Sequence, residues 1–411
     1  MSRKFFSVFV IALSQVAIMA IWFSASAIAP SLQRIYSLDA NEISLLTSAV
    51  QLGFVVGALI SAAFGLSDRL DPRRLILGAG LTAAALNLVF LVIYPGSILA
   101  VIIRFLCGMC MALVYPVGMK IMASWAATDT EKGGRTDRGL LVAILVAALT
   151  LGSSSPHLFN FFGGLDWRVT IFVASLSAAA GALLVLLAKL GPLYAPSPSF
   201  RVKDAFAAFT QPSLRLVNFG YLGHMWELYA MWAWIIVFFE ASFFLDIGNN
   251  DAATLMARLA TFVVIGGGGV IGCIVAGFMA DRIGRTTLTI IAMAGSGVCA
   301  VLIGFFYGQD VYLVMAVAFI WGAFIIADSA QFSAGVSELA QPDKIGTMLT
   351  VQTAAGFLLT LVSIHLIPSL VQIVGWEHAF AFLAIGPAIG IVSMARLRRH
   401  PDAVKMAGGK R

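Results

Sequence analysis

A histidine and a glutamate, His224 and Glu227, lie close together within a long apolar stretch. Because they are three residues apart, a helix places them on one face. A carboxyl group and an imidazole that share a buried site can exchange a proton near neutral pH. We therefore predict that Glu227 carries a proton and that His224 tunes it. The alternative is a neutral hydrogen-bonded pair that only packs the helix.

Arg104 and Asp328 are two more charged residues within apolar stretches. A charged side chain inside a membrane is costly unless it faces water or a partner, so such residues mark transport pathways or buried ion pairs. We predict a functional role for both, in which Asp328 transfers a proton or pairs with Lys120 in one conformation. The alternatives for Arg104 are a structural ion pair and a side chain that reaches the outer interface.

The residues that usually build enzyme, metal or nucleotide sites do not form such sets. Five histidines on separate segments give no metal-ligand spacing, and all four cysteines, Cys107, Cys110, Cys273 and Cys299, fall in apolar runs. The glycine pattern at residues 267–272 follows no strand, so helix packing explains it better than nucleotide binding. We expect no metal, no cofactor and no enzymatic activity.

The composition is that of a membrane protein. Hydrophobic residues make up 60% of the 411 residues and charged residues 11%, with a mean hydropathy of +0.95. So few charges cannot cover a water-soluble globule of this size. The basic residues are spread between apolar runs rather than gathered into a groove, which indicates membrane topology and not a nucleic-acid partner.

Twelve apolar runs are long enough to cross a bilayer, which needs about 20 residues of helix for each crossing. Lipid offers no hydrogen-bond partners, so these runs must be helices. The first six are Phe5 to Ala29, Ile43 to Leu66, Leu75 to Tyr94, Ile98 to Trp125, Leu140 to Phe162 and Val169 to Leu190. The second six are Leu214 to Leu245, Leu255 to Ala280, Leu288 to Tyr307, Val311 to Ala334, Met348 to Val374 and Ala379 to Ala395.

Two short charged segments repeat between the halves. Ser67-Asp68-Arg69-Leu70-Asp71-Pro72-Arg73-Arg74 is echoed by Ala280-Asp281-Arg282-Ile283-Gly284-Arg285, and Gly164-Leu165-Asp166-Trp167-Arg168 by Val374-Gly375-Trp376-Glu377. The repeats predict an internally duplicated, all-α membrane protein with twelve transmembrane helices in two pseudo-symmetric six-helix bundles. We place the first bundle at residues 1–190, a cytoplasmic linker at 191–213 and the second bundle at 214–411.

The charged loops carry a resemblance over the whole length to the major facilitator superfamily, whose loop motif G-x-x-x-D-R-x-G-R-R lies between helices 2 and 3 and recurs between helices 8 and 9. The second copy matches at Gly277, Asp281, Arg282, Gly284 and Arg285. The first matches at Asp68, Arg69, Arg73 and Arg74, while Phe64 and Asp71 occupy glycine positions and Pro72 interrupts the basic run. The resemblance implies a cytoplasmic gate made by these residues. An Asp at a helix end can pair with Arg or with the N-terminus of a helix in the other half only while that side is closed. The alternative is that these charges only set topology and cap helices.

The resemblance also bears on the residues within the helices. Arg104 and Gly108 resemble a pattern that proton-coupled members carry on helix 4, with Cys107 where a Gln often stands. In this family helices 1, 4, 7 and 10 line the central cavity, which predicts that Gln15, Trp22, Tyr115, Tyr221, Trp321, Phe324 and Gln331 face the substrate. Other polar residues, Ser153 and His157 among them, are expected to form hydrogen bonds between helices.

Lys and Arg concentrate in the loops on one side of the twelve runs, which places both termini in the cytoplasm. We predict a multi-pass monomer in a bacterial cytoplasmic membrane. Its predicted function is secondary active transport of a small organic solute by alternating access, coupled to protons. An inorganic-anion porter of the nitrate or nitrite type is one alternative, although the second run has no Arg to hold the anion. A channel or receptor without transport and a membrane enzyme are further alternatives.

Overall fold

The computed structural model describes residues 3–126, 138–163, 166–194 and 200–410, and every regular element among them is helical. Gly164 and Leu165 of the second predicted repeat lie outside the described residues. The first half of the chain contains α1 (Arg3–Met19), α2 (Ser24–Ala27), α3 (Ala29–Tyr36), α4 (Ala40–Phe64), α5 (Leu66–Arg69), α6 (Pro72–Val89), α7 (Ile98–Met111), α8 (Tyr115–Ala123), α9 (Arg138–Phe162) and α10 (Trp167–Leu184).

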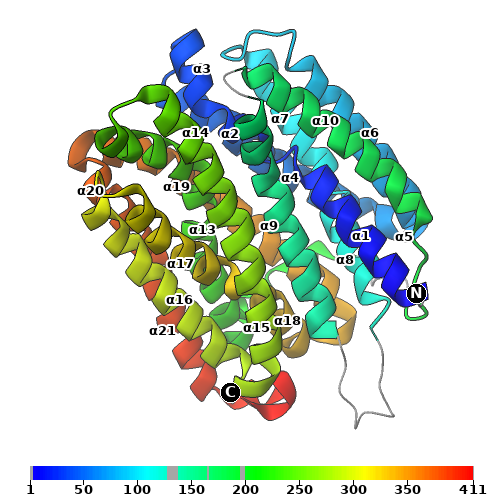
Figure 1. Cartoon of the computed structure of the whole chain (residues 1–411). Coiled ribbons are helices and arrows are strands. Elements are labelled where there is room, and N and C mark those ends of the chain that lie inside the picture. The colour runs from blue at the N-terminus through cyan, green and yellow to red at the C-terminus, as the bar shows by residue number, and fades with distance from the viewer. Residues whose placement is uncertain (1–2, 127–137, 164–165, 195–199, 411) are drawn as a thin grey trace.

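The second half begins after two short helices, α11 (Val202–Ala205) and α12 (Ala207–Thr210), which occupy part of the predicted linker. Its helices are α13 (Pro212–Ile247), α14 (Asn250–Thr261), the π-helical segment η2 (Phe262–Gly268), α15 (Gly269–Ile283), α16 (Arg285–Leu302), α17 (Val311–Ala327), α18 (Ser329–Leu339), α19 (Ile345–Val374), α20 (Trp376–Ala379) and α21 (Ile385–Arg399). Both ends of the chain lie at the same end of the molecule, opposite α3 and α14 (Figure 1).

Ten helical stretches among the described residues are long and apolar enough to cross a membrane. They are Ala40–Phe64, Ile98–Ala123, Gly139–Phe162, Trp167–Leu187, Pro212–Ile247, Asn250–Ala280, Arg285–Phe306, Val311–Leu339, Pro342–Val374 and Trp376–Arg399. The other two predicted runs correspond to α1 and α2, which are separated after Met19, and to α6, which begins beside Arg73 and Arg74. The prediction of an all-helical membrane protein is thus confirmed, and the count of twelve crossings stays a prediction.

Local sequence signals explain where several of these helices begin and end. Asp39 caps α4 through a capping box with Glu42, and the side chain of Asp71 accepts a hydrogen bond from the Arg73 backbone at the start of α6. Gly65 ends α4 at φ +60°, a conformation that favours glycine. The charged loop of the first half therefore has a defined shape at both of its ends.

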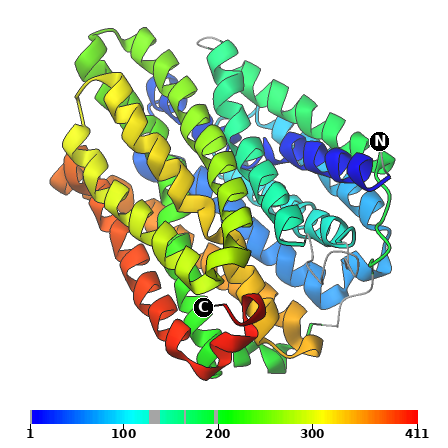
Figure 2. The same cartoon turned by 60° about the horizontal axis from the view of Figure 1, so that its bottom comes forward.

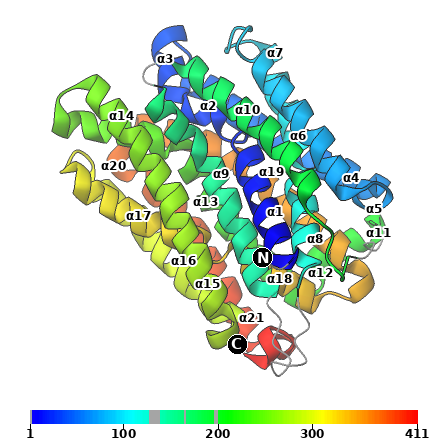
Figure 3. The same cartoon turned by 45° about the vertical axis from the view of Figure 1, so that its right-hand side comes forward.

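Helices of the two halves pack closely along two seams, α4 against α19 and α9 against α15. Figure 2 shows the helices before residue 190 mostly on one side of the molecule and the later helices on the other. Within the first half, α4 and α7 approach so closely that a side chain at Gly53 or Gly108 would overlap the backbone of the facing helix. In Figure 3, α8, α12 and α18 lie at the end of the molecule that holds the N-terminus.

Candidate functional site

Glu227 is buried where three helices of the second half meet. It lies on α13 and is 1% exposed. Its Oε1 accepts a hydrogen bond from Trp321 Nε1 on α17 at 2.7 Å, and its Oε2 accepts one from Ser296 Oγ on α16 at 2.8 Å. Both carboxyl oxygens therefore have a fixed donor, which holds the group in one orientation.

His224 contacts a different acid from the one predicted. Its Nδ1 lies 2.8 Å from Asp328 Oδ1, and both side chains are almost completely buried. The reason is local, because α17 ends at Ala327 and α18 starts at Ser329, so Asp328 stands at a break in the helix where it reaches α13. His224 thus pairs with Asp328 instead of with Glu227, as was predicted, and Glu227 has its own partners, Trp321 and Ser296.

Lys120 does not contact Asp328 in this structure. Its ammonium group forms an ion pair with Asp68, at the start of the charged loop of the first half. The same ammonium group lies 5.0 Å from the centre of the Tyr194 ring, and the Tyr194 hydroxyl donates to the Ser67 carbonyl. Lys120 therefore interacts with the charged loop of the first half and not with the buried acids.

Arg104 is buried among neutral oxygens. Its Nη1 donates to Ser24 Oγ and Asn87 Oδ1, both at 3.0 Å, and its Nη2 donates to the carbonyls of Ile21 at 3.0 Å and Trp22 at 2.8 Å. The two carbonyls are available because regular α-helix stops at Met19 and resumes at Ser24. Arg104 thereby fixes the break in the first helix, and none of the contacts described for it involves a carboxylate.

An aromatic cluster, which we define as Trp22, Phe23, Phe54, Tyr229, Trp232 and Phe357, joins the two halves of the chain. Trp22 stacks on Tyr229 with ring centres 6.1 Å apart, and Phe54 meets Phe357 at 4.6 Å. All six side chains are buried. Sequence reasoning named only Trp22, because aromatic residues that face another helix and those that face lipid look alike in an apolar run.

The other predicted cavity residues are distributed differently. Trp321 donates to Glu227, Phe324 packs against Gly295 of α16, and Gln331 accepts from Arg285 at 2.8 Å, so these three side chains serve contacts within the second half. Gln15 donates to the Val114 carbonyl at 3.4 Å, and the ring of Tyr221 lies 6.1 Å from that of His224. Tyr115 is half-buried at the start of α8.

A further polar group lies where α14 meets α9 and α3. Arg258 of α14 donates to the Asn160 carbonyl of α9 at 2.9 Å and to Ser31 Oγ of α3 at 3.3 Å. His157 lies one turn before Asn160 on α9. Both ring nitrogens of His157 and Oγ of Ser153 are buried without a hydrogen-bond partner among the described residues. Such groups are rare unless water or a ligand satisfies them.

The predicted gate residues form two separate local networks. In the first loop, Arg73 binds both carboxyl oxygens of Asp71, at 3.1 and 2.7 Å, and this contact lowers the pKa of Asp71 to about 2. In the second loop, Arg285 binds both carboxyl oxygens of Glu338, at 2.8 and 2.7 Å. Gly284 has φ +88°, and Arg69, Arg74 and Arg282 are exposed.

The contact between the halves in this region is made by a glycine. A side chain at Gly277 of α15 would collide with Ala143 of α9, so the glycine permits the two helices to approach. The side chain of Asp281 lies outside the described residues, as do Lys132 and Arg135 of the loop before α9.

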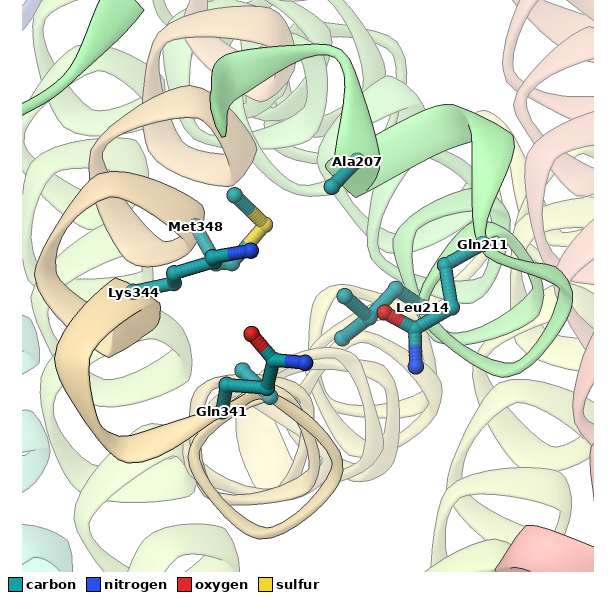
Figure 4. Close-up of a pocket in the computed structure, with 7 residues that line it drawn as sticks. Ala207, Gln211, Leu214, Gln341, Lys344 and Met348 are labelled. Carbon is teal, nitrogen blue, oxygen red and sulfur yellow. The ribbon is translucent and has the colours of Figure 1, made fainter. Parts of the chain in front are cut away.

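A small cavity lies where the linker meets the second half. Its volume is about 40 Å³, and the side chains of Gln211, Gln341 and Lys344 surround it (Figure 4). That space suits one or two water molecules and is too small for an organic solute. The aromatic cluster and the buried acids therefore remain the candidate site.

Comparison with protein families decides the class. The model of the Major Facilitator Superfamily matches residues 11–363 and 247–410, which together span nearly the whole chain. The chain belongs to the major facilitator superfamily. This confirms the resemblance seen in the loops, and it assigns the chain to a family of transporters rather than to a class of enzymes.

Two relatives within this superfamily show what the chain is similar to. A gallate transporter of Pseudomonas putida is 25% identical over 324 residues, which cover 71% of this chain and 69% of the relative. An uncharacterized MFS-type transporter, YceJ of Bacillus subtilis (strain 168), is 25% identical over 377 residues, 90% of each chain. Neither name refers to nitrate, so the inorganic-anion alternative gains no support.

Proposed function

We propose that this superfamily member is a proton-coupled secondary transporter that moves an aromatic carboxylic acid across the membrane by alternating access. The observation that carries the proposal is the pair of buried acidic groups, Glu227 and His224–Asp328, held within one half of the chain next to an aromatic cluster that joins both halves. A solute that binds between the halves would change their contact, and with it the position of the helices that carry Glu227, His224 and Asp328.

The architecture that we propose has twelve crossings in two six-helix bundles, residues 1–190 and 214–411, joined by the linker 191–213. Ten crossings are supported by length and apolarity, and α1 with α2, together with α6, would supply the other two. The basic loops favour cytoplasmic termini in a bacterial inner membrane. We propose a monomer, because each half buries its partner.

Glu227 is the proposed proton carrier. This carboxyl group can keep its position whether or not it is protonated, since Trp321 can donate to Oε1 in both forms, and the Ser296 hydroxyl can donate to the carboxylate or accept from the acid at Oε2. The pair His224–Asp328 offers a second site for a proton. His224 lies on α13, as Glu227 does, and Asp328 lies at the break between α17 and α18. We propose that protonation of these groups and binding of the solute bias the same rearrangement.

The solute would bind at the aromatic cluster. In this structure the rings contact one another, Phe23 edge-to-face against Trp232 at 5.6 Å, and we propose that they separate to receive the planar ring of the solute. A carboxylate would be received by Arg258 and His157, whose ring nitrogens are buried without partners among the described residues. The name of the Pseudomonas relative makes gallate the first compound to test.

We propose that the structure is closed on its outer side, opposite the chain termini. Arg34 of α3 lies 3.4 Å from Glu240 of α13 in an ion pair between the halves, and Thr254 of α14 donates to the same carboxylate. Arg258 adds bonds from α14 to α9 and α3. Gly277 already lets α15 approach α9 in this state. In the opposite state the loop residues Asp68, Arg69, Arg73, Arg74, Asp281, Arg282, Gly284 and Arg285 would complete the closure of the cytoplasmic side.

The proposal is tested with the purified protein in liposomes loaded at a pH different from that of the bath. We expect labelled gallate to accumulate in response to the pH gradient and to lose that accumulation when the gradient is collapsed. Pyrogallol, which lacks the carboxylate, and cyclohexanecarboxylate, which lacks the aromatic ring, should both compete poorly. Equal competition by cyclohexanecarboxylate would contradict the aromatic site, and transport that ignores the pH gradient would contradict proton coupling.

A further inference from the structure

A surface groove lies on the first half of the chain, and all of its lining residues belong to that half. Its volume is about 550 Å³, and it is lined by Arg69, Leu70, Asp71, Arg74, Leu75, Gly78, Ala79, Thr82, Cys110 and Leu113. The groove begins at the charged loop after α5 and follows α6 alongside α7. In Figure 3, α5 lies at the edge of the molecule. One end of the groove is therefore polar, and the rest is apolar.

The charges at the polar end do not cancel. Asp71 is occupied by Arg73, which binds both of its oxygens and also donates to the Ala188 carbonyl at 3.3 Å. Because the pKa of Asp71 is lowered to about 2, this pair stays ionised across the physiological range. Arg69 and Arg74 are exposed at the same end, and the described residues give neither of them a carboxylate. Two cations thus remain for a ligand.

The apolar part of the groove is open and long enough to receive part of an acyl chain. Gly78 is exposed, and a side chain built on it would meet no atom within 4 Å. From Arg74 to Thr82 the wall of α6 covers two helical turns, roughly 12 Å at about 1.5 Å for each residue. Leu70 is 51% exposed beside the opening, which leaves an apolar side chain for lipid to cover.

We propose that this groove binds one anionic phospholipid, with its phosphate at Arg69 and Arg74 and an acyl chain along Leu75, Gly78 and Thr82. Basic pockets at the cytoplasmic ends of membrane helices recognise anionic headgroups in this way. Free phosphate would satisfy the two arginines and leave the apolar wall uncovered, so the observations favour a lipid. The site differs from the solute site, and the inference does not depend on the proposed transport.

The test counts lipids that stay bound to the detergent-purified protein by native mass spectrometry, with phosphatidylglycerol and phosphatidylcholine of the same acyl chains. We expect one phosphatidylglycerol to bind in preference to phosphatidylcholine. The double variant Arg69→Ala/Arg74→Ala should weaken that binding roughly thirtyfold, from the usual contribution of two basic residues near a membrane surface. Arg396→Ala/Arg399→Ala, which removes two exposed arginines elsewhere, should leave it unchanged.

A second variant tests the acyl-chain part without changing charge. Gly78→Trp would place an apolar side chain in the groove from a Cβ position that meets no atom within 4 Å, so it should displace the lipid while the protein stays folded. Ile102→Trp on the exposed face of α7 is the matched control. Equal binding of the two lipids, unchanged binding in Gly78→Trp, or full competition by inorganic phosphate would each overturn the proposal.

Discussion

Arg104 in the first half and Glu227 in the second are both ionisable groups 1% exposed within apolar helices, yet their surroundings differ in kind. Arg104 donates to four neutral oxygens, two of which are backbone carbonyls at a helix break. Glu227 accepts from two side chains that can serve it charged or neutral. A buried arginine with rigid neutral partners thus fixes a structure. A buried acid whose serine partner can either donate or accept can change its protonation without moving.

The largest effect is expected from Arg104→Met. The change removes the Arg104 donor from the buried Trp22 carbonyl and takes one donor each from the Ile21 carbonyl and Asn87 Oδ1, so unfolding should become easier by about 3 kcal/mol. Thermal unfolding in detergent, followed by size-exclusion chromatography, measures this loss. A stable Arg104→Met protein that transports without protons would instead show that Arg104 takes part in coupling and would contradict its structural role.

The variant Trp321→Phe tests the surroundings of Glu227. The variant removes the donor to Glu227 Oε1 and leaves a buried acceptor unsatisfied, which should cost about 1–3 kcal/mol of stability and also impair pH-driven accumulation. Trp234→Phe is the matched control, because Trp234 donates at 2.8 Å to the backbone carbonyl of Ile364. It should lower stability and leave the ratio of accumulated solute to pH gradient unchanged. The same change in that ratio for both variants would count against Glu227.

The pair His224–Asp328 is tested by a double-mutant cycle with His224→Gln and Asp328→Asn. Since the two groups are in contact and buried, their coupling energy should be on the order of 1 kcal/mol. The thermal stabilities of the four proteins give that energy. A cycle with Glu227→Gln in place of Asp328→Asn should give a smaller value, whereas a larger one would restore the pairing predicted from sequence.

The smallest effect is expected at the surface. Asp71→Asn removes the ion pair with Arg73, which is partly exposed, so stability should fall by less than about 1 kcal/mol. Because the folded-state pKa of Asp71 is lowered to about 2 from 3.8, its contribution is fully present above pH 3.8 and disappears as the pH falls through 2. The difference in melting temperature between wild type and variant should therefore stay constant from pH 8 to about pH 4. A difference that vanishes near neutral pH would assign the effect to another group.

Hydropathy was sufficient to predict the helices, because a bilayer imposes both the length and the hydrogen bonding of each crossing. The family was predicted from the resemblance of the loop motif, which matches best at Asp281, Arg282 and Arg285. The buried groups Arg104, His224, Glu227 and Asp328 were also found, since charge inside apolar runs is a strong signal. Their partners were not predicted. Spacing along α13 suggested His224 with Glu227, but the break at Asp328 brings a third group to His224.

The aromatic cluster and the contacts of Arg258 could not be predicted either, because they join residues that are far apart in the sequence. Phe54 and Phe357 lie about three hundred residues apart, and only the packing of α4 on α19 brings their rings to 4.6 Å. His157 was expected only to form hydrogen bonds between helices, and Arg258 was not among the predicted site residues. Their contacts depend on the approach of α14 to α9, which one sequence does not reveal.

If Glu227 carries the coupled proton, the variant Glu227→Gln should separate solute exchange from proton-driven accumulation in liposomes. The amide keeps a group that resembles the protonated acid, so we predict that the variant exchanges labelled gallate for unlabelled gallate across the membrane at a rate similar to wild type. It should no longer accumulate gallate in response to a pH gradient. If Glu227→Gln accumulates gallate as wild type does, the proton is carried elsewhere and the account is wrong.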